Sequence, residues 1–209
     1  MKKIALINGS PKYKDSASGC ILDIYKKQLS NHEITEFNFR TKEVKDIEKL
    51  CENQICVLAF PLYVDGVPAH VLSCLQQMAD YLQDKKLDIS VYAIVNSGFY
   101  EGKQNQYALE IIKNWCVKSN IRWCQGIGVG GGGMISMLNN PSSASEPLKD
   151  IIAMINKQIV LIEEGRMEEN QYESPNFPKL FYKIAAEQGW RQLIKKNGLK
   201  TKALFTQIR

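Results

Sequence analysis

Short apolar runs alternate along the chain with stretches in which apolar residues recur every three or four positions. The runs are typical of buried strands, and the spaced pattern is typical of helices that bury one face. Alternation of this kind through about residue 163 predicts an α/β fold, a parallel sheet covered by helices on both faces. The five predicted strands are residues 3–8, 33–39, 55–60, 89–96 and 121–129.

Four helices are predicted around these strands, because their apolar residues fall on one helical face. Pro68 suits a first helical position, where its missing N–H costs no hydrogen bond. Residues 41–51 are predicted as a short helix or an irregular crossover. The four predicted helices are residues 18–29, 68–82, 104–118 and 146–163.

The last part of the chain is predicted as an extension, residues 164–209, of one domain that spans residues 1–163. From residue 175 onward there are eight Lys or Arg residues and one acidic residue, so the net charge of +5 belongs to this end of the chain. We expect a basic amphipathic segment that packs on the domain or on a partner subunit. Its apolar residues at helical spacing are Phe177, Leu180, Phe181, Ile184, Ala185, Trp190, Leu193 and Ile194.

Composition narrows the class of protein further. A chain of 209 residues with 44% hydrophobic and 23% charged residues is typical of one globular domain. Its longest apolar run, residues 55–64, contains a proline and is far shorter than the ~20 residues that span a bilayer. The six cysteines form no CxxC pair and no cluster with the two histidines, so zinc and iron–sulfur sites lack their usual ligand spacing. We therefore expect a cytoplasmic protein with reduced thiols, no metal and no membrane span.

Candidate chemistry lies in the loops that follow the first, third and fourth predicted strands, "GSPKYKDSAS", "PLYVDGVP" and "NSGFYEGK". Ligands of open α/β sheets bind beyond the carboxyl ends of the strands, where these loops lie. The first loop combines serine hydroxyls, two lysines and the N–H groups of a helix start, which favour a phosphate. It is neither a Walker loop nor a dinucleotide fingerprint, and by itself it is also typical of an ordinary capped turn.

A second glycine-rich stretch, "GIGVGGGGM", matches the dinucleotide spacing G-x-G-x-x-G twice, at Gly126/Gly128/Gly131 and at Gly128/Gly130/Gly133. That fingerprint should open a helix, but Asn139, Asn140 and Pro141 interrupt any helix that begins here. We interpret the stretch as a flexible loop after the fifth strand that borders the cleft, and not as a nucleotide site.

Taken together, "INGSPK" with "SAS", "PLYVDGVPAHVL" and "NSGFYEG" resemble the NAD(P)H-dependent flavin-reductase and quinone-reductase branch of the flavodoxin-like superfamily. The resemblance covers residues 1–163 and implies a doubly wound sheet of order 2-1-3-4-5 with bound FMN. It implies that the FMN phosphate is surrounded by Ser10, Lys12, Ser16, Ala17 and Ser18. It also implies that the ring lies between Pro61, Leu62, Tyr63 and Val64 and, opposite them, Asn96, Ser97, Gly98, Phe99 and Tyr100.

The resemblance implies an FMN-dependent oxidoreductase that uses NADH or NADPH to reduce a quinone, a nitro or azo compound, or free flavin by two-electron hydride transfer. No catalytic side chain is predicted, because the flavin carries the chemistry. We expect a homodimer or higher homo-oligomer, a small-molecule electron acceptor and no specific nucleic acid. Two alternatives stay open: a flavodoxin-type electron carrier without NAD(P)H oxidase activity, and a binding module whose basic tail contacts nucleic acid or an anionic membrane.

Overall fold

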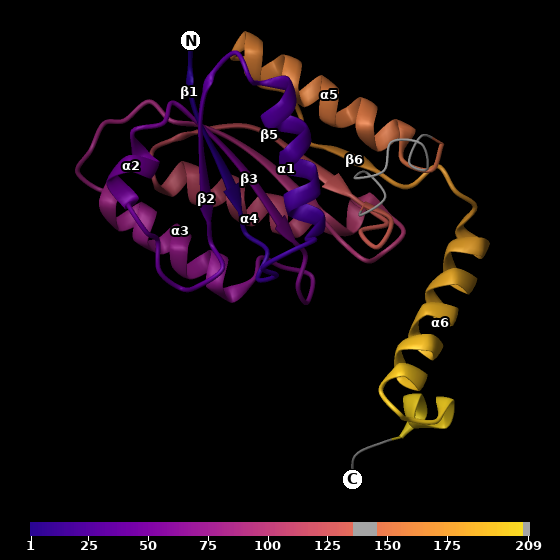
Figure 1. Ribbon diagram of the computed structural model, residues 1–209. Helices are drawn as coiled ribbons and strands as arrows, with labels where there is room; N and C mark the ends of the chain where they lie inside the picture. Colours follow the sequence, from indigo (N-terminus) through magenta and orange to yellow (C-terminus); the bar gives the residue numbers. More distant parts are fainter. Residues whose placement is uncertain (136–145, 207–209) are drawn as a thin grey trace. The chain divides into compact units, whose positions relative to one another are not determined.

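A six-stranded parallel sheet of order β2-β1-β3-β4-β5-β6 forms the centre of the fold in the computed structural model, which describes residues 1–135 and 146–206 (Figure 1). The first five strands confirm the predicted positions to within one residue and the predicted order 2-1-3-4-5. Asn139–Pro141, which were predicted to interrupt any helix after the fifth strand, lie outside the described residues. The strands are β1 (Lys3–Asn8), β2 (Glu33–Asn38), β3 (Ile55–Pro61), β4 (Ser90–Asn96), β5 (Arg122–Val129) and β6 (Gln171–Glu173).

Helices cover the sheet on both faces and bury one apolar cluster on each side (Figure 1). One face is covered by α1 (Ala17–Gln28) and α5 (Lys149–Glu164). The other is covered by α2 (Ile47–Cys51), α3 (Ala69–Leu82) and α4 (Gln106–Lys118), with the short 3-10 helix η1 (Gly102–Asn105) before α4. Both sides of the central strand β3 are therefore buried, which explains its uninterrupted apolar run.

The sixth strand was not predicted and corrects the expected five-stranded sheet. Residues of β6 pair in parallel with the end of β5, from Ile127 with Gln171 to Val129 with Glu173. A strand of three residues carries too little apolar periodicity to be detected in the sequence. Because of this pairing, the first compact unit of the chain runs from Met1 to Pro175 and includes residues that the sequence pattern had placed in the extension.

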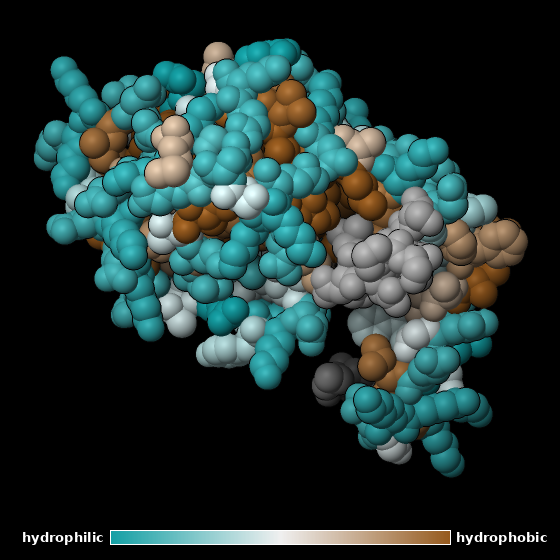
Figure 2. Space-filling view, turned by 45° about the horizontal axis from the view of Figure 1, so that its top comes forward, coloured by the Kyte–Doolittle hydropathy of each residue, from teal (hydrophilic) through white to brown (hydrophobic). Residues whose placement is uncertain are grey.

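The second compact unit, Asn176–Arg209, contains α6 (Lys179–Lys196) and the 3-10 helix η3 (Thr201–Phe205). None of the side chains of α6 is buried. From Ile184 to Trp190 a helix turns by about 600°, so the apolar residues of its two halves point in different directions. Hydrophobic and hydrophilic side chains accordingly lie next to each other on this helix in Figure 2. Among the helices of the described residues, none is long and apolar enough to cross a membrane.

Candidate functional site

The loops after β1, β3 and β4 meet at one edge of the sheet, and the side chain and backbone of Asn96 join them. Its Nδ2 donates to the Ser18 Oγ at the start of α1 (2.9 Å) and to the Phe60 carbonyl at the end of β3 (3.1 Å). Its carbonyl accepts from the Leu62 N–H (2.8 Å). One buried amide at the end of β4 therefore holds all three candidate loops together.

The first loop uses its serine hydroxyls as hydrogen-bond acceptors. Ser16 caps α1, because its Oγ accepts from the Gly19 N–H (3.0 Å). The Ser10 Oγ accepts from the Lys12 N–H (3.3 Å), and the Ser10 N–H donates to the Asn8 Oδ1 (2.9 Å). A hydroxyl also carries one hydrogen that it can donate. Both buried serines therefore keep an O–H donor for a ligand oxygen.

The start of α1 adds positive potential to the first loop. The N–H groups of Ala17 and Ser18 belong to the first turn, where a helix offers no carbonyl acceptor, and this turn contains no acidic residue. Lys12 and Lys14 are exposed on the same loop. Hydroxyls, helix N–H groups and two ammonium groups together make a suitable environment for a phosphate.

The second loop is a tight turn that exposes apolar side chains. Tyr63 and Gly66 exchange two backbone hydrogen bonds of 3.0 Å, and the two residues between them have positive φ angles, 47° for Val64 and 57° for Asp65. A β-branched residue at positive φ is strained, by about 1–3 kcal/mol. The Val64 side chain is nevertheless fully exposed, and that of Tyr63 is 46% exposed. The protein thus retains a strained backbone to present an apolar surface at this edge.

The third loop contains a buried polar group without a partner. The Ser97 hydroxyl is buried and makes no hydrogen bond to any residue that the structure describes. Leaving a buried polar group unpaired costs about 1–3 kcal/mol. The ring of Phe99, two residues further on, is 51% exposed. A ligand with a polar edge and a flat apolar face would satisfy both side chains.

The glycine-rich stretch is hydrogen-bonded to the third loop. Gly126 and Gly128 lie within β5, and the next glycines donate backbone hydrogen bonds: Gly130 to the Glu173 carbonyl (2.9 Å), Gly131 to the Phe99 carbonyl and Gly132 to the Ser97 carbonyl (both 2.6 Å). A Cβ at Gly130 would lie 2.0 Å from the Tyr100 carbonyl oxygen. These N–H groups already donate to carbonyls of the protein, which argues against a dinucleotide phosphate at this stretch.

Two contacts of the site were not foreseen from the sequence. The segment after β6 holds the third loop, because the Tyr100 hydroxyl donates to the Pro175 carbonyl and the Gly102 N–H to the Ser174 Oγ (both 3.2 Å). His70, near the start of α3, lies with its Nε2 3.0 Å from the Gly9 carbonyl of the first loop. In the sequence, the only indication that His70 lies near the site was its position at the start of the helix that follows the second loop.

Thiol and metal chemistry receive no support in the part of the chain that the structure covers. All six cysteines are buried and none forms a disulfide. Burial raises the pKa of the Cys56 thiol to about 12 and those of Cys51 and Cys74 to about 11, so these thiols stay protonated near neutral pH. Residues 1–135 and 146–206 contain no group of three or more His, Cys, Asp or Glu side chains that could hold a metal ion.

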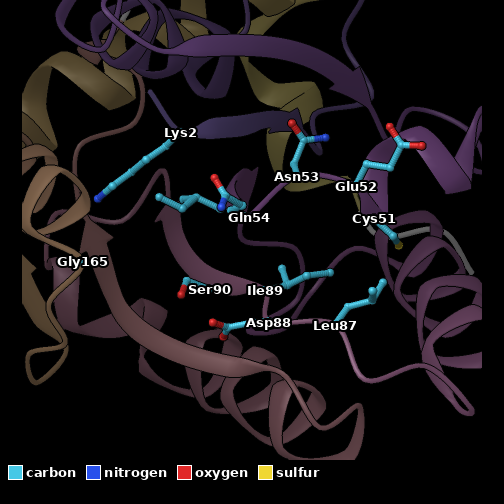
Figure 3. Close-up of a pocket in the computed structure, with 11 residues that line it drawn as sticks. Lys2, Cys51, Glu52, Asn53, Gln54, Leu87, Asp88, Ile89, Ser90 and Gly165 are labelled. Carbon is cyan, nitrogen blue, oxygen red and sulfur yellow. The ribbon is translucent and has the colours of Figure 1, made fainter.

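A cavity of about 420 Å³ lies at the opposite, amino-terminal edge of the sheet, between the segments that lead into β3 and β4 (Figure 3). Lys2 points away from Asn53 and Glu52 in this view, and its Nζ donates to the carbonyls of Ile162 and Glu163 (both 2.8 Å). That ammonium group therefore caps the end of α5. This cavity is separate from the three loops.

Comparison with solved structures identifies the fold. A putative quinone reductase from Klebsiella pneumoniae is similar over 78% of this chain and 85% of its own, with a TM-score of 0.55 and 12% identity. The FMN-bound flavodoxin of Fusobacterium nucleatum is similar over 79% of this chain and 99% of its own, with a TM-score of 0.54 and 14% identity. A WrbA-like flavodoxin protein from Agrobacterium tumefaciens is similar over 59% and 76%, with a TM-score of 0.50 and 10% identity.

The first compact unit therefore has the flavodoxin-like fold, and the resemblance seen in the three sequence elements is confirmed at this level. Among solved structures the similar proteins include both a putative quinone reductase and a flavodoxin. No protein-family model and no curated protein matches the sequence.

Proposed function

We propose that this protein is an FMN-dependent oxidoreductase that takes two electrons from NADH or NADPH as a hydride and reduces a small-molecule acceptor. The acceptor would be a quinone, a nitro or azo compound, or free flavin. The Asn96 side chain carries this proposal, because it joins a phosphate-suited loop to the two loops that expose apolar surface. The flavodoxin-like fold, shared with an FMN-bound flavodoxin, supports it.

FMN fits the polar groups found at this edge. Its phosphate would accept from the hydroxyls of Ser10 and Ser16, from the N–H groups of Ala17 and Ser18, and from the exposed Lys12. The polar edge of its ring would satisfy the Ser97 hydroxyl, which has no partner among the described residues. The remaining residues of the proposed site contribute apolar contact or backbone groups: Pro61, Leu62, Tyr63, Val64, Asn96, Gly98, Phe99 and Tyr100.

When bound, FMN would supply the hydride-accepting chemistry, and the protein would supply placement. The exposed rings of Tyr63 and Phe99 would cover an aromatic ring system and keep water from it. The buried Asn96 would keep the phosphate loop and the ring loops at a constant separation. No side chain of this chain is required to transfer a proton. Of the two carboxylates that the second and third loops contain, Asp65 lies in the tight turn at positive φ and Glu101 directly precedes η1.

A flavodoxin-type electron carrier is the alternative, and the likeness to the Fusobacterium flavodoxin favours it equally at the level of fold. The charge distribution favours the reductase, because residues before 175 carry a net charge of only −2, whereas flavodoxin carriers are strongly acidic.

We further propose that the protein is a cytoplasmic homodimer or higher homo-oligomer, with the second unit packed on the first or on a partner subunit. Light scattering during size-exclusion chromatography measures the oligomeric state.

Visible absorption under anaerobic conditions tests the proposal. The purified protein, loaded with FMN, should show the absorption bands of oxidised flavin, and NADPH or NADH should bleach them. A protein that binds FMN but is not bleached by either nucleotide would be the electron carrier. A protein that takes up no FMN would contradict both functions.

A further inference from the structure

A second cavity, of about 390 Å³, lies beside the first loop at the carboxyl end of β2. Tyr13 of the first loop forms one wall, and the connection between β2 and α2, residues 39–46, forms another. Loop and cavity share this wall, so a ligand in the cavity would lie next to the proposed phosphate site. Nothing in the proposed flavin site uses the cavity.

The connection that lines the cavity is anchored to α3. The Cys74 thiol donates to the Thr41 carbonyl (3.2 Å), and the Gln77 side chain accepts from the Val44 N–H (3.1 Å) and donates to the Lys42 carbonyl. At its start, the Phe39 N–H donates to the Asn8 carbonyl of β1 (2.9 Å). These bonds hold the wall in place without a ligand, which reduces the entropy cost of binding.

Arg40 is the one arginine among the described residues that line this cavity, and much of its hydrogen-bonding capacity is unused. Its Nη2 donates to the Tyr13 carbonyl (3.3 Å), and its guanidinium lies 5.0 Å from the centre of the Tyr13 ring. Its Nε is buried without a partner among the described residues. A guanidinium has five N–H donors in a planar fork that matches phosphate oxygens. Arg40 and the 78% exposed Tyr13 ring are thus suited to a phosphate next to an aromatic base.

The charges around Arg40 favour an anion. Lys45 and Lys49 line the same cavity. Three acidic residues line it as well, but Glu36 is paired with Lys26 outside it, which leaves Glu43 and Asp46 against three bases. Lys12 and Lys14 are the neighbours of Tyr13 in the sequence and are exposed on the first loop, where Asp15 is exposed as well. With the paired Glu36 set aside, the lining of the cavity and the first loop therefore both carry more basic than acidic groups.

We propose that this cavity binds the adenosine end of the reducing nucleotide and that Arg40, with Lys49, recognises its 2′-phosphate, so that NADPH is preferred over NADH. The inference rests on the proposed function, which leaves the choice of nucleotide open. NADPH and NADH differ only in this phosphate. If Arg40→Gln lowers the affinity for NADPH but not that for NADH, the lost interaction is the one with the 2′-phosphate. This holds even if the variant also shifts the first loop through Tyr13, because such a shift would affect both nucleotides.

The direct test is calorimetric binding of adenosine 2′,5′-bisphosphate and of adenosine 5′-monophosphate to the FMN-loaded full-length protein. The wild type should bind the bisphosphate at least about tenfold more tightly, and Arg40→Gln should abolish most of that difference. Lys49→Gln, at a second basic residue of the cavity lining, should reduce it by a smaller factor. Lys86→Gln, an exposed lysine in a different cavity, serves as the control and should leave it unchanged.

Steady-state kinetics with both nucleotides completes the test. In Arg40→Gln the KM for NADPH should rise about tenfold or more, while the KM for NADH stays close to that of the wild type. Equal affinities for the two adenosine phosphates in the wild type, or equal KM increases for both nucleotides in the variant, would overturn the inference. Preferential bisphosphate binding without any nucleotide oxidation would contradict the proposed function and leave an adenosine-phosphate site at Arg40.

Discussion

At the scale of single residues, the site combines two features that cost stability. Val64 has a positive φ angle although it is β-branched, and the Ser97 hydroxyl is buried without a partner among the residues described. Strain and unpaired polar groups of this kind concentrate where a protein meets a ligand. Each makes a prediction that separates the stability of the empty protein from its affinity for FMN.

Ser97→Ala should weaken FMN binding about three- to tenfold without lowering the stability of the empty protein, because the hydroxyl it removes makes no hydrogen bond there. Ser119→Ala is the matched control. Its hydroxyl is also buried without a partner in the described chain, but it lies at the end of α4, away from the loops. Flavin fluorescence titration and urea unfolding measure the two quantities. A Ser97→Ala protein that unfolds more easily and binds FMN normally would contradict the assignment.

Val64→Asn should raise the free energy of unfolding by about 1 kcal/mol, since asparagine tolerates positive φ and the exposed valine loses no packing. It should also weaken FMN binding, because the apolar surface is lost. Val117→Asn replaces an exposed valine in helix α4, where no such strain exists, and should not stabilise. Thermal unfolding of the three proteins compares them, and an unchanged or lowered Tm for Val64→Asn would speak against strain at this turn.

At the scale of elements, close backbone packing shapes the third loop. Gly130→Ala would place a Cβ 2.0 Å from the Tyr100 carbonyl oxygen, so we expect a loss of about 1–3 kcal/mol of stability together with weaker FMN binding. Gly133→Ala would meet no atom of the described residues within 4 Å and should change neither. Denaturant unfolding and FMN titration of both variants check this. Equal behaviour of the two alanines would show that the packing is unimportant.

The elements also show what the sequence can and cannot reveal. Strands β1, β3, β4 and β5 were predicted because buried parallel strands carry apolar runs, whereas β2 is a partly exposed edge strand with a shorter apolar pattern. The order of the strands came from the resemblance to flavodoxin-like proteins, and the loops at their carboxyl ends followed from that topology. Strand β6 was missed because it has three residues. The bond from Asn96 to Ser18 and the contact of His70 with Gly9 join residues 78 and 61 positions apart, which no local pattern encodes.

At the scale of the whole molecule, every residue of the proposed flavin site belongs to the first compact unit, Met1–Pro175. A protein shortened to residues 1–175 should therefore fold and bind FMN with unchanged affinity, and should lose the positive net charge. Circular dichroism and FMN titration of the shortened and full-length proteins compare these properties. A shortened protein that folds but no longer binds FMN would place part of the site in the second unit.

The central claim is that the three loops bind a flavin and that the first loop holds its phosphate. Calorimetric titration of the flavin-free protein with FMN and, separately, with riboflavin, which lacks the phosphate, tests it most directly. We predict that FMN binds at least about a hundredfold more tightly than riboflavin, because charge-assisted hydrogen bonds from the first loop depend on the phosphate. Equal affinities, or no binding of FMN, would contradict the account.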